Sequence, residues 1–166
     1  MNITGYPLDA DDFRSAMRRW ATGITVVTAK HAGVQHGMTV SSFTSISLEP
    51  PLILVSLEQG AKTTQLIQES STFAVNILGE DQQLISERFA GRLPGFSDRF
   101  DGLELLFLKS GAPLLADSLA GFDCRVISAR DVGNHTLYIG EVIDMRLGKN
   151  SDPLIYFGQN YHQVDC

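Results

Sequence analysis

The stretch from Gly121 to Leu147, GFDCRVISARDVGNHTLYIGEVIDMRL, holds two long runs of strand-forming residues on either side of a short turn. Because β-branched and aromatic residues favour strands and Gly-Asn favours turns, it predicts strands at 121–131 and 135–147, joined through 132–134. Strands joined by so short a turn pair antiparallel. The stretch therefore predicts one long antiparallel hairpin.

Other strand patterns surround this hairpin, and few helices interrupt them. Strands are predicted at residues 24–29, 35–45, 52–57, 73–78 and 154–157, and helices at Asp9–Trp20, from about Thr63, and at Asp81–Ala90. A doubly wound parallel sheet needs a helix after nearly every strand, which this order does not provide. The order favours a mostly antiparallel barrel with helices packed outside, formed as a single domain over residues 1–166.

Each predicted helix carries apolar residues three or four positions apart. They are Phe13, Ala16, Met17 and Trp20 in the first, Leu66 and Ile67 in the second, and Leu84, Ile85 and Phe89 in the third. This spacing places them on one face of each helix, and we expect that face to be buried.

Charge and composition exclude several classes of protein. The chain has 166 residues and a formal net charge of −6, from 13 Lys and Arg against 19 Asp and Glu. Because affinity for nucleic acid or an anionic membrane depends on Lys and Arg, neither partner is expected, although a pocket for one anionic ligand is compatible with this charge. No apolar run approaches the ~20 residues of a membrane span, and residues 1–12 lack the pattern of a signal peptide.

The two cysteines, Cys124 and Cys166, form no CxxC pair. Cys124 lies mid-strand, where a buried and unreactive thiol is expected. Reduced thiols indicate a reducing compartment, so we expect a cytoplasmic protein.

A hydroxyl-rich segment, Gly37-Met38-Thr39-Val40-Ser41-Ser42-Phe43, stands within the strand pattern. Hydroxyls and backbone amides on an apolar wall are typical of a pocket for a planar heterocycle. Thr and Ser are also common in edge strands, and the pattern taken alone favours that interpretation.

A second segment, Gly60-Ala61-Lys62-Thr63-Thr64, opens the second predicted helix. The free N–H groups of a helix start, with a lysine and two threonines, would bind a phosphate. A threonine N-cap without any ligand explains one threonine equally well.

Two further segments carry polar or aromatic side chains. Gly133-Asn134-His135 places a histidine at a turn, where it is either a hydrogen-bonding group for a ligand or a simple turn residue. Tyr156 and Tyr161 flank a short segment and would either stack on a flat ligand or close the core. Arg88, Arg92 and Arg99 are interpreted as part of a solvated loop in preference to a substrate clamp, with a functional role left open for Arg99 beside Phe100. No zinc spacing, GxGxxG, P-loop or GxSxG motif is present in the sequence, and no metal is expected.

Several of these segments together resemble the flavin reductase-like family. These are short NAD(P)H:flavin oxidoreductases, many of them the reductase component of two-component flavin-dependent monooxygenases. The segments are, in chain order, Phe13-Arg14, 22–28 (TGITVVT), 37–43 (GMTVSSF), 47–52 (SLEPPL), 73–78 (FAVNIL) and 140–142 (GEV). The similarity runs from about Phe13 to Tyr161, nearly the whole chain.

The resemblance implies a fold and a set of site residues. The fold is an FMN-binding split β-barrel, antiparallel and Greek-key-like, in a homodimer with the flavin near the subunit interface. The flavin would be bound by Thr39, Val40, Ser41, Ser42, Ser56, Leu57, Ala61, Lys62, Thr63, Thr64, Phe89, Ala90 and Gly91. The nicotinamide nucleotide would lie near His135, Gln159, Asn160 and Tyr161, with His135 as the catalytic residue. Asn134 stands where the family's turn has an acidic residue.

The implied function is NAD(P)H-dependent reduction of flavin, FMN or FAD, with NADH or NADPH as co-substrate. A separate flavin-dependent oxygenase would receive the reduced flavin. Two other functions stay open at this point: a non-enzymatic flavin- or haem-binding carrier or sensor on the same barrel, and a ligand-free interaction module.

Overall fold

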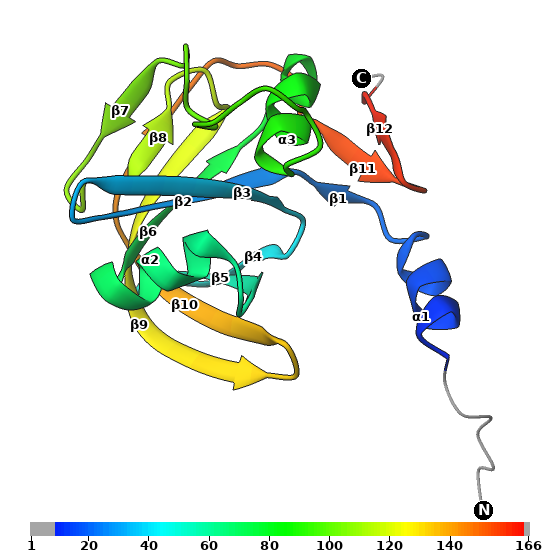
Figure 1. Cartoon of the computed structure of the whole chain (residues 1–166), viewed down its shortest axis with the longest axis horizontal. Coiled ribbons are helices and arrows are strands. Elements are labelled where there is room, and N and C mark those ends of the chain that lie inside the picture. Colours follow the sequence, from blue (N-terminus) through cyan, green and yellow to red (C-terminus); the bar gives the residue numbers. More distant parts are fainter. Residues whose placement is uncertain (1–8, 165–166) are drawn as a thin grey trace, which may run out of the picture.

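The protein is described from a computed structural model, which covers residues 9–164 (Figure 1). Its helices are α1 (Ala10–Met17), α2 (Lys62–Ser70) and α3 (Gln83–Phe89), with one 3-10 turn, η1 (Glu80–Gln82). Its strands are β1 (Thr22–Gly23), β2 (Thr25–His31), β3 (Val34–Val40), β4 (Phe43–Leu48), β5 (Pro51–Glu58), β6 (Thr72–Ile77), β7 (Leu105–Phe107), β8 (Pro113–Leu115), β9 (Ala120–Val132), β10 (His135–Leu147), β11 (Ile155–Phe157) and β12 (Asn160–His162).

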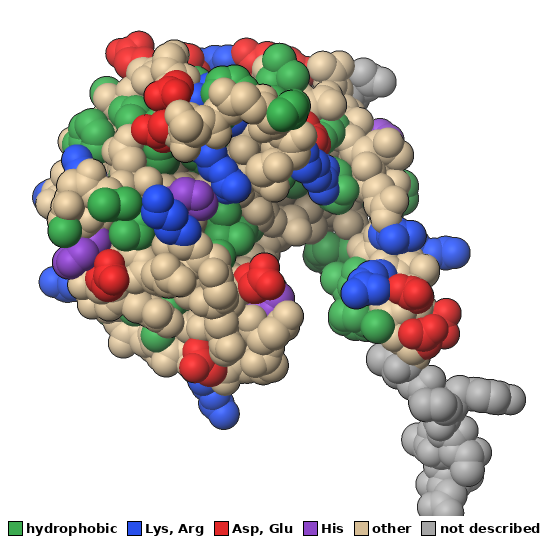
Figure 2. Space-filling model, in the orientation of Figure 1, with side chains coloured by type: hydrophobic (Ala, Val, Ile, Leu, Met, Phe, Trp, Pro, Cys, Tyr) green, Lys and Arg blue, Asp and Glu red, His purple; other side chains and the backbone are tan. Residues whose placement is uncertain are grey.

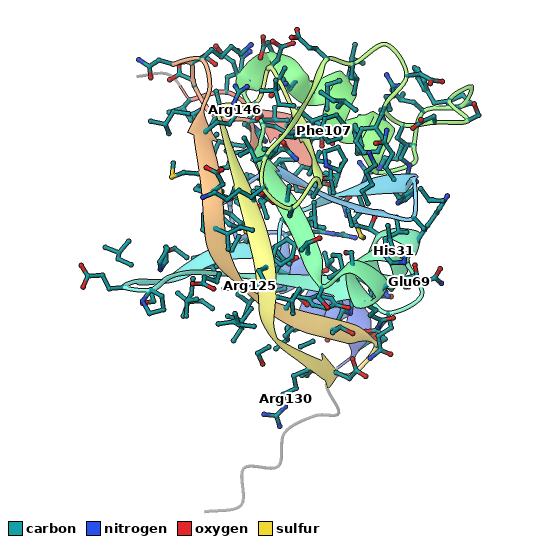
Figure 3. The ribbon with its side chains drawn as sticks, turned by 90° about the vertical axis from the view of Figure 1, so that its left-hand side faces the viewer. His31, Glu69, Phe107, Arg125, Arg130 and Arg146 are labelled. Carbon is teal, nitrogen blue, oxygen red and sulfur yellow. The ribbon has the colours of Figure 1, made fainter. Side chains whose placement is uncertain are left out.

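Seven strands form one antiparallel sheet in the order β3-β2-β6-β9-β10-β5-β4. β9 and β10 are the predicted hairpin, and they pair from Ala120 opposite Leu147 to Val132 opposite His135. β9 also pairs with β6 and β10 with β5, so the hairpin joins the first half of the sheet to the second. Figure 3 views the hairpin from outside, with Arg125 and Arg130 on β9. The prediction of a mostly antiparallel β fold with peripheral helices is confirmed.

The strand predicted at 35–45 is wrong as a single element, because the chain turns a corner between β3 and β4. Ser42 Oγ donates to the carbonyl of Ser56 at 2.6 Å, and the backbone N–H of Ser56 donates back to the carbonyl of Ser42 at 3.3 Å. These bonds draw the chain away from β2 and onto β5. The sequence also gave no indication of the short strands β1, β7, β8 and β12.

Two clusters of buried side chains form most of the core. The first lies between the sheet and α2, and it contains Leu66 and Ile67 as predicted. The second contains Phe89 of α3 with Phe100 and Leu154, and Tyr156 and Tyr161 pack against it. The first cluster supports β3 from the α2 side, and Phe89 supports it from the α3 side.

Two predictions of buried helix faces are wrong. Leu84 is 71% exposed, because α3 is only seven residues long and packs through Phe89. Phe13, Met17 and Trp20 are 55%, 50% and 67% exposed. The reason is visible in Figure 1, where α1 extends away from the sheet; within the described chain its end reaches the β11–β12 turn, where the N–H of Gly158 donates to the carbonyl of Arg18.

The structure also bears on the cysteines and on membrane spans. Cys124 is fully buried in the first cluster, as predicted. Burial raises the pKa of its thiol, which stays protonated and unreactive at neutral pH. Cys166 lies outside the described residues. Within residues 9–164, no helix has the length and apolar character to cross a membrane.

Candidate active site

The corner between β3 and β4 carries the predicted hydroxyl-rich segment. Thr39 Oγ1 donates to the carbonyl of Ser86 at 2.6 Å, which ties β3 to α3, and Ser42 is tied to Ser56 as described above. Val40 is buried. Ser41 is exposed, and its hydroxyl forms no hydrogen bond with any described residue. The segment joins β3 to β4, the two edge strands of the sheet, as the edge-strand interpretation indicates, and its corner also presents the free hydroxyl of Ser41.

Three cavities meet at Ser41. The first, of about 300 Å³, is lined by Met38, Thr39, Val40, Ser41, Ser42, Ser56, Glu58 and His135. The second, of about 140 Å³, is lined by Ile24, Thr39, Val40, Ser41, Ala90, Arg92, Tyr156 and Tyr161. The third, of about 330 Å³, lies between α1 and the β11–β12 turn and includes Trp20, Tyr156 and Gln159. Cavities with an apolar lining and a few polar groups are typical of small-molecule sites.

His135 begins β10 and lies opposite Glu58 of β5. Its Nδ1 lies 2.8 Å from Oδ1 of Asn134. An amide oxygen only accepts, so Nδ1 donates, and Nε2 of the neutral ring is an acceptor. The structure thus brings His135 to the first cavity with Thr39, Ser41 and Ser56, as the resemblance implied.

The three residues near the C-terminus that were expected to contact the nucleotide lie in different surroundings in the structure. Tyr161 Oη lies 2.9 Å from Ser86 Oγ, and its ring packs edge-on against Tyr156 with centroids 5.4 Å apart. Burial raises the pKa of Tyr161, so its hydroxyl stays protonated. Tyr161 lines the second cavity and Gln159 the third, whereas the Asn160 side chain donates to the carbonyl of Gly158.

The start of α2 differs from both interpretations of its threonines. The N-cap is Ala61, and no side chain caps the helix. Thr63 and Thr64 lie in the first turn and are fully buried. Thr64 Oγ1 donates to the carbonyl of Glu58 at 2.7 Å. Thr63 Oγ1 lies 2.8 Å from His36 Nδ1. Their hydroxyls are used within the protein. Only the exposed Lys62 and the backbone at Ala61 are accessible to a phosphate.

Two more of the implied flavin contacts belong to the core. The side chains of Leu57 and Phe89 are fully buried, so they support the site from behind and are not accessible to a ligand. Of the segment from Phe89 to Gly91, Ala90 lines the second cavity. Gly91 is exposed, with φ at +73°.

The interpretation of the arginines as a solvated loop is wrong for two of them. Arg88 is buried and donates to the carbonyls of Asp98 and Asp101, and its guanidinium lies 3.8 Å from the ring centre of Phe96. Arg99 Nη1 donates to the carbonyls of Gly37 and Phe89 at 2.9 and 2.7 Å. These contacts fold the loop back onto β3. Arg92 is exposed and pairs with Glu87, but it also lines the second cavity, which its charge and spacing alone did not indicate.

Comparison with known proteins gives consistent matches over nearly the whole chain. Residues 17–165 match the family model described as "Flavin reductase like domain". The reductase component of a 4-nitrophenol 4-monooxygenase/4-nitrocatechol 2-monooxygenase from Rhodococcus opacus is 38% identical over 91% of this chain and 79% of its own length. The FMN reductase (NADH) SmoA of Agrobacterium fabrum is 38% identical over 88% of this chain and 81% of its own. The solved structure of the flavin reductase PheA2 is 42% identical, with a TM-score of 0.88 over 96% of this chain and all of that one.

Proposed function

Because this chain belongs to the flavin reductase-like family, we propose that it reduces free or loosely bound flavin with electrons from a reduced nicotinamide nucleotide. The reduced flavin then leaves for a separate flavin-dependent monooxygenase, as the name of the Rhodococcus opacus relative indicates for that protein. The relatives are named as reductases, which favours an enzyme over a carrier, a sensor or a ligand-free module.

The observation that carries this proposal is the meeting of three cavities at Ser41. A flavin and a nicotinamide must lie against each other for transfer, so their sites must share a wall. The lining fits a flavin, because the corner offers a free hydroxyl on Ser41 beside apolar Val40 and Met38. A bound flavin supplies the acceptor for a hydride from the reduced nicotinamide.

The chain's own residues bind and orient the two ligands. Thr39 and Ser42, held by their hydrogen bonds to Ser86 and Ser56, fix the corner that supports the flavin ring. Nε2 of His135 accepts a hydrogen bond from the carboxamide of the nicotinamide, because Nδ1 is committed to Asn134. Correct orientation of two reactants supplies much of the rate in such a reaction.

Other residues act on the flavin phosphate and on the nucleotide. Lys62 and the backbone at Ala61 bind the phosphate, which explains how an acidic protein holds an anion locally. Tyr161 and Gln159 contact the nucleotide from the second and third cavities.

The proposal includes a homodimer in the cytoplasm, where reduced nicotinamide nucleotides are available. The exposed Phe13 and Met17 on α1 and the exposed Trp20 just after it support the dimer, since an apolar surface of this kind is normally covered. Light scattering after size-exclusion chromatography should give twice the chain mass of 18.2 kDa.

The test combines purified protein with FMN or FAD and with NADH or NADPH, and follows nicotinamide absorbance at about 340 nm. We expect at least one combination of flavin and nucleotide to give oxidation of the nucleotide well above the rate with free flavin and no protein. No oxidation above that background with any of the four pairs would refute the proposed function. His135→Ala is expected to raise the KM for the nucleotide more than it lowers kcat, because His135 positions the nicotinamide and transfers no proton.

A further inference from the structure

The β11–β12 hairpin carries two of the residues expected to contact the nucleotide, Gln159 and Tyr161, yet few strand pairs attach it to the rest of the chain. Its sheet has three strands in the order β1-β11-β12, and β1 contributes two residues, Thr22 and Gly23. Within the described chain, β12 pairs with β11 alone. The position of the hairpin therefore depends on contacts outside its own sheet.

The turn of this hairpin has a strained backbone. Phe157 pairs with Asn160, and the two residues between them, Gly158 and Gln159, have φ values of +59° and +69°. Two positive φ values suit a tight turn between antiparallel strands. Glycine adopts this conformation freely, whereas glutamine adopts it at a cost in free energy. Such a conformation persists where the surrounding structure holds the residue in place.

Arg18, the residue that ends α1, bonds to this turn in two ways. Its carbonyl accepts a hydrogen bond from the N–H of Gly158 at 3.0 Å. Its guanidinium donates from Nη2, at 2.6 Å, and from Nε to the carboxamide oxygen of Gln159, in the amide orientation that these two donors require. Figure 2 shows Lys and Arg side chains at this place, where α1 joins the body of the molecule. Arg18 therefore fastens both the backbone and the side chain of the strained turn to α1.

A guanidinium suits this contact better than another cation would. Arginine presents its N–H donors in a rigid planar fork, whereas the ammonium of lysine is a single point of charge on a flexible chain. Arg18 forms no ion pair with any carboxylate in residues 9–164, so no charged partner there competes with Gln159.

The turn forms part of the wall of the third cavity. Arg18 and Gln159 line this cavity together with Ser41 and Tyr156. Tyr156 packs edge-on against Tyr161, and both tyrosines line the second cavity. A shift of the hairpin therefore moves side chains in both of the cavities that meet the first one at Ser41.

We propose that Arg18 is a positioning residue for the nicotinamide nucleotide. It holds the strained turn in place before the nucleotide binds, so that Gln159 and Tyr161 already lie where they contact it. Preorganisation of this kind strengthens binding, because the ligand does not have to order the turn. The proposal rests on the proposed function and adds a residue that the resemblance did not imply.

Arg18→Gln tests the proposal, with Arg19→Gln as the matched control. Both arginines are exposed and adjacent at the end of α1, but Arg19 does not line the third cavity. Without Arg18, part of the binding energy of the nucleotide must order the turn, so the KM for the nucleotide should rise about three- to tenfold with little change in kcat. The KM for flavin should change by less than about twofold, and Arg19→Gln should match the parent protein.

Gln159→Gly separates support of the turn from a direct contact between Arg18 and the nucleotide. Glycine needs no support at this φ and offers no side chain to Arg18. In the Gln159→Gly background, the further change Arg18→Gln should raise the KM for the nucleotide by less than about twofold, because the two residues act through one contact. Arg18→Lys keeps the charge without the planar fork and should recover part of the lost affinity.

A second measurement does not depend on turnover. Amide hydrogen exchange of the whole protein reports how often each segment opens. In Arg18→Gln, the amides of residues 157–160 should exchange about three- to tenfold faster than in the parent protein. Arg19→Gln should leave their exchange unchanged.

Several outcomes would overturn the inference. They include equal KM values for the nucleotide in the two arginine variants, and unchanged exchange at residues 157–160 in Arg18→Gln. An equal rise in KM with Gln159 and with Gln159→Gly, or full recovery in Arg18→Lys, would show that the charge of Arg18 binds the nucleotide directly, and would refute its positioning role. Failure of the proposed function looks different, because the parent protein would then reduce no flavin while the exchange of the hairpin amides would still respond to Arg18→Gln.

Discussion

Replacing Gly37 by alanine tests how tightly β3 is packed against α3. A Cβ at this position would lie 2.8 and 2.9 Å from Cε1 and Cδ1 of Phe89, and 3.1 Å from Cγ2 of Thr28. Phe89 is fully buried and packs edge-on against Phe100, with ring centres 5.1 Å apart, so its ring has little room to move. The contact is therefore a true overpacking of the core.

The magnitude follows from two opposing terms. Overpacking a core by one carbon typically costs about 1–3 kcal/mol. Replacing a strand glycine gains about 0.5–1 kcal/mol, because the unfolded chain loses freedom. The two terms leave a net loss of about 0–2.5 kcal/mol, with a middle value of about 1 kcal/mol. The free energy of unfolding of Gly37→Ala should thus fall by about 1 kcal/mol, or about 2–4 °C in Tm for a chain of this size. The KM for flavin should rise too, since Thr39 follows on the same strand and Ser41 comes directly after its end.

Urea unfolding followed by circular dichroism measures the change, with Gly23→Ala as the control. A Cβ on Gly23 meets no atom within 4 Å, so that variant should be as stable as the parent protein or slightly more so. Equal unfolding midpoints for the two variants would show that β3 and α3 adjust without cost, and would refute the rigid support assigned to the corner at Ser41.

Three further predictions concern the site. Lys62→Ala should weaken flavin binding by about 1.5–3 kcal/mol in a fluorescence titration, and an unchanged affinity would remove Lys62 from the phosphate site. His36, which faces Arg99, Lys62 and Asp98, has a pKa lowered to about 4, so the folded protein takes up its proton at lower pH than the unfolded chain. Stability should therefore fall as the pH drops from about 6.5 to about 4, by about 2 kcal/mol, and parallel pH profiles for the parent and His36→Gln would contradict this. Tyr161→Phe removes one neutral hydrogen bond to α3 and should raise the KM for the nucleotide about two- to tenfold with little change in kcat; an unchanged KM would exclude the hydroxyl from positioning the nucleotide.

The elements that were predictable from sequence are those in which local pattern and packing agree. The β9–β10 hairpin has strong strand formers on both sides of a Gly-Asn turn, and Leu66 and Ile67 pack against the sheet as their spacing indicates. The apolar face of α1 has the same kind of spacing but lies exposed. Spacing shows which side of a helix is apolar, whereas burial also needs a second surface, and the β11–β12 turn, which the end of α1 reaches, leaves Phe13 and Met17 at least half exposed.

The site was predictable at its corner and less so elsewhere. The resemblance, which rests on the order of the motifs, implied that Ser41 and His135 lie near the same ligands, and the structure places both residues at one cavity. The roles of Thr63, Thr64 and Arg99 were not predictable, because each depends on a carbonyl or ring from a distant segment. The residue type determines which hydrogen bonds a side chain can form. Only the tertiary structure shows whether another part of the protein already forms them.

The place of the β9–β10 hairpin in the sheet has a consequence for biosynthesis. β6 and β5 leave the ribosome early, yet each keeps one edge unpaired until residues 120–147 have been made. Unpaired edges favour association with other chains, and non-local pairing is slow. The nascent chain therefore passes through a stage in which the two halves of the sheet cannot yet pair through the β9–β10 hairpin and expose strand edges to other chains.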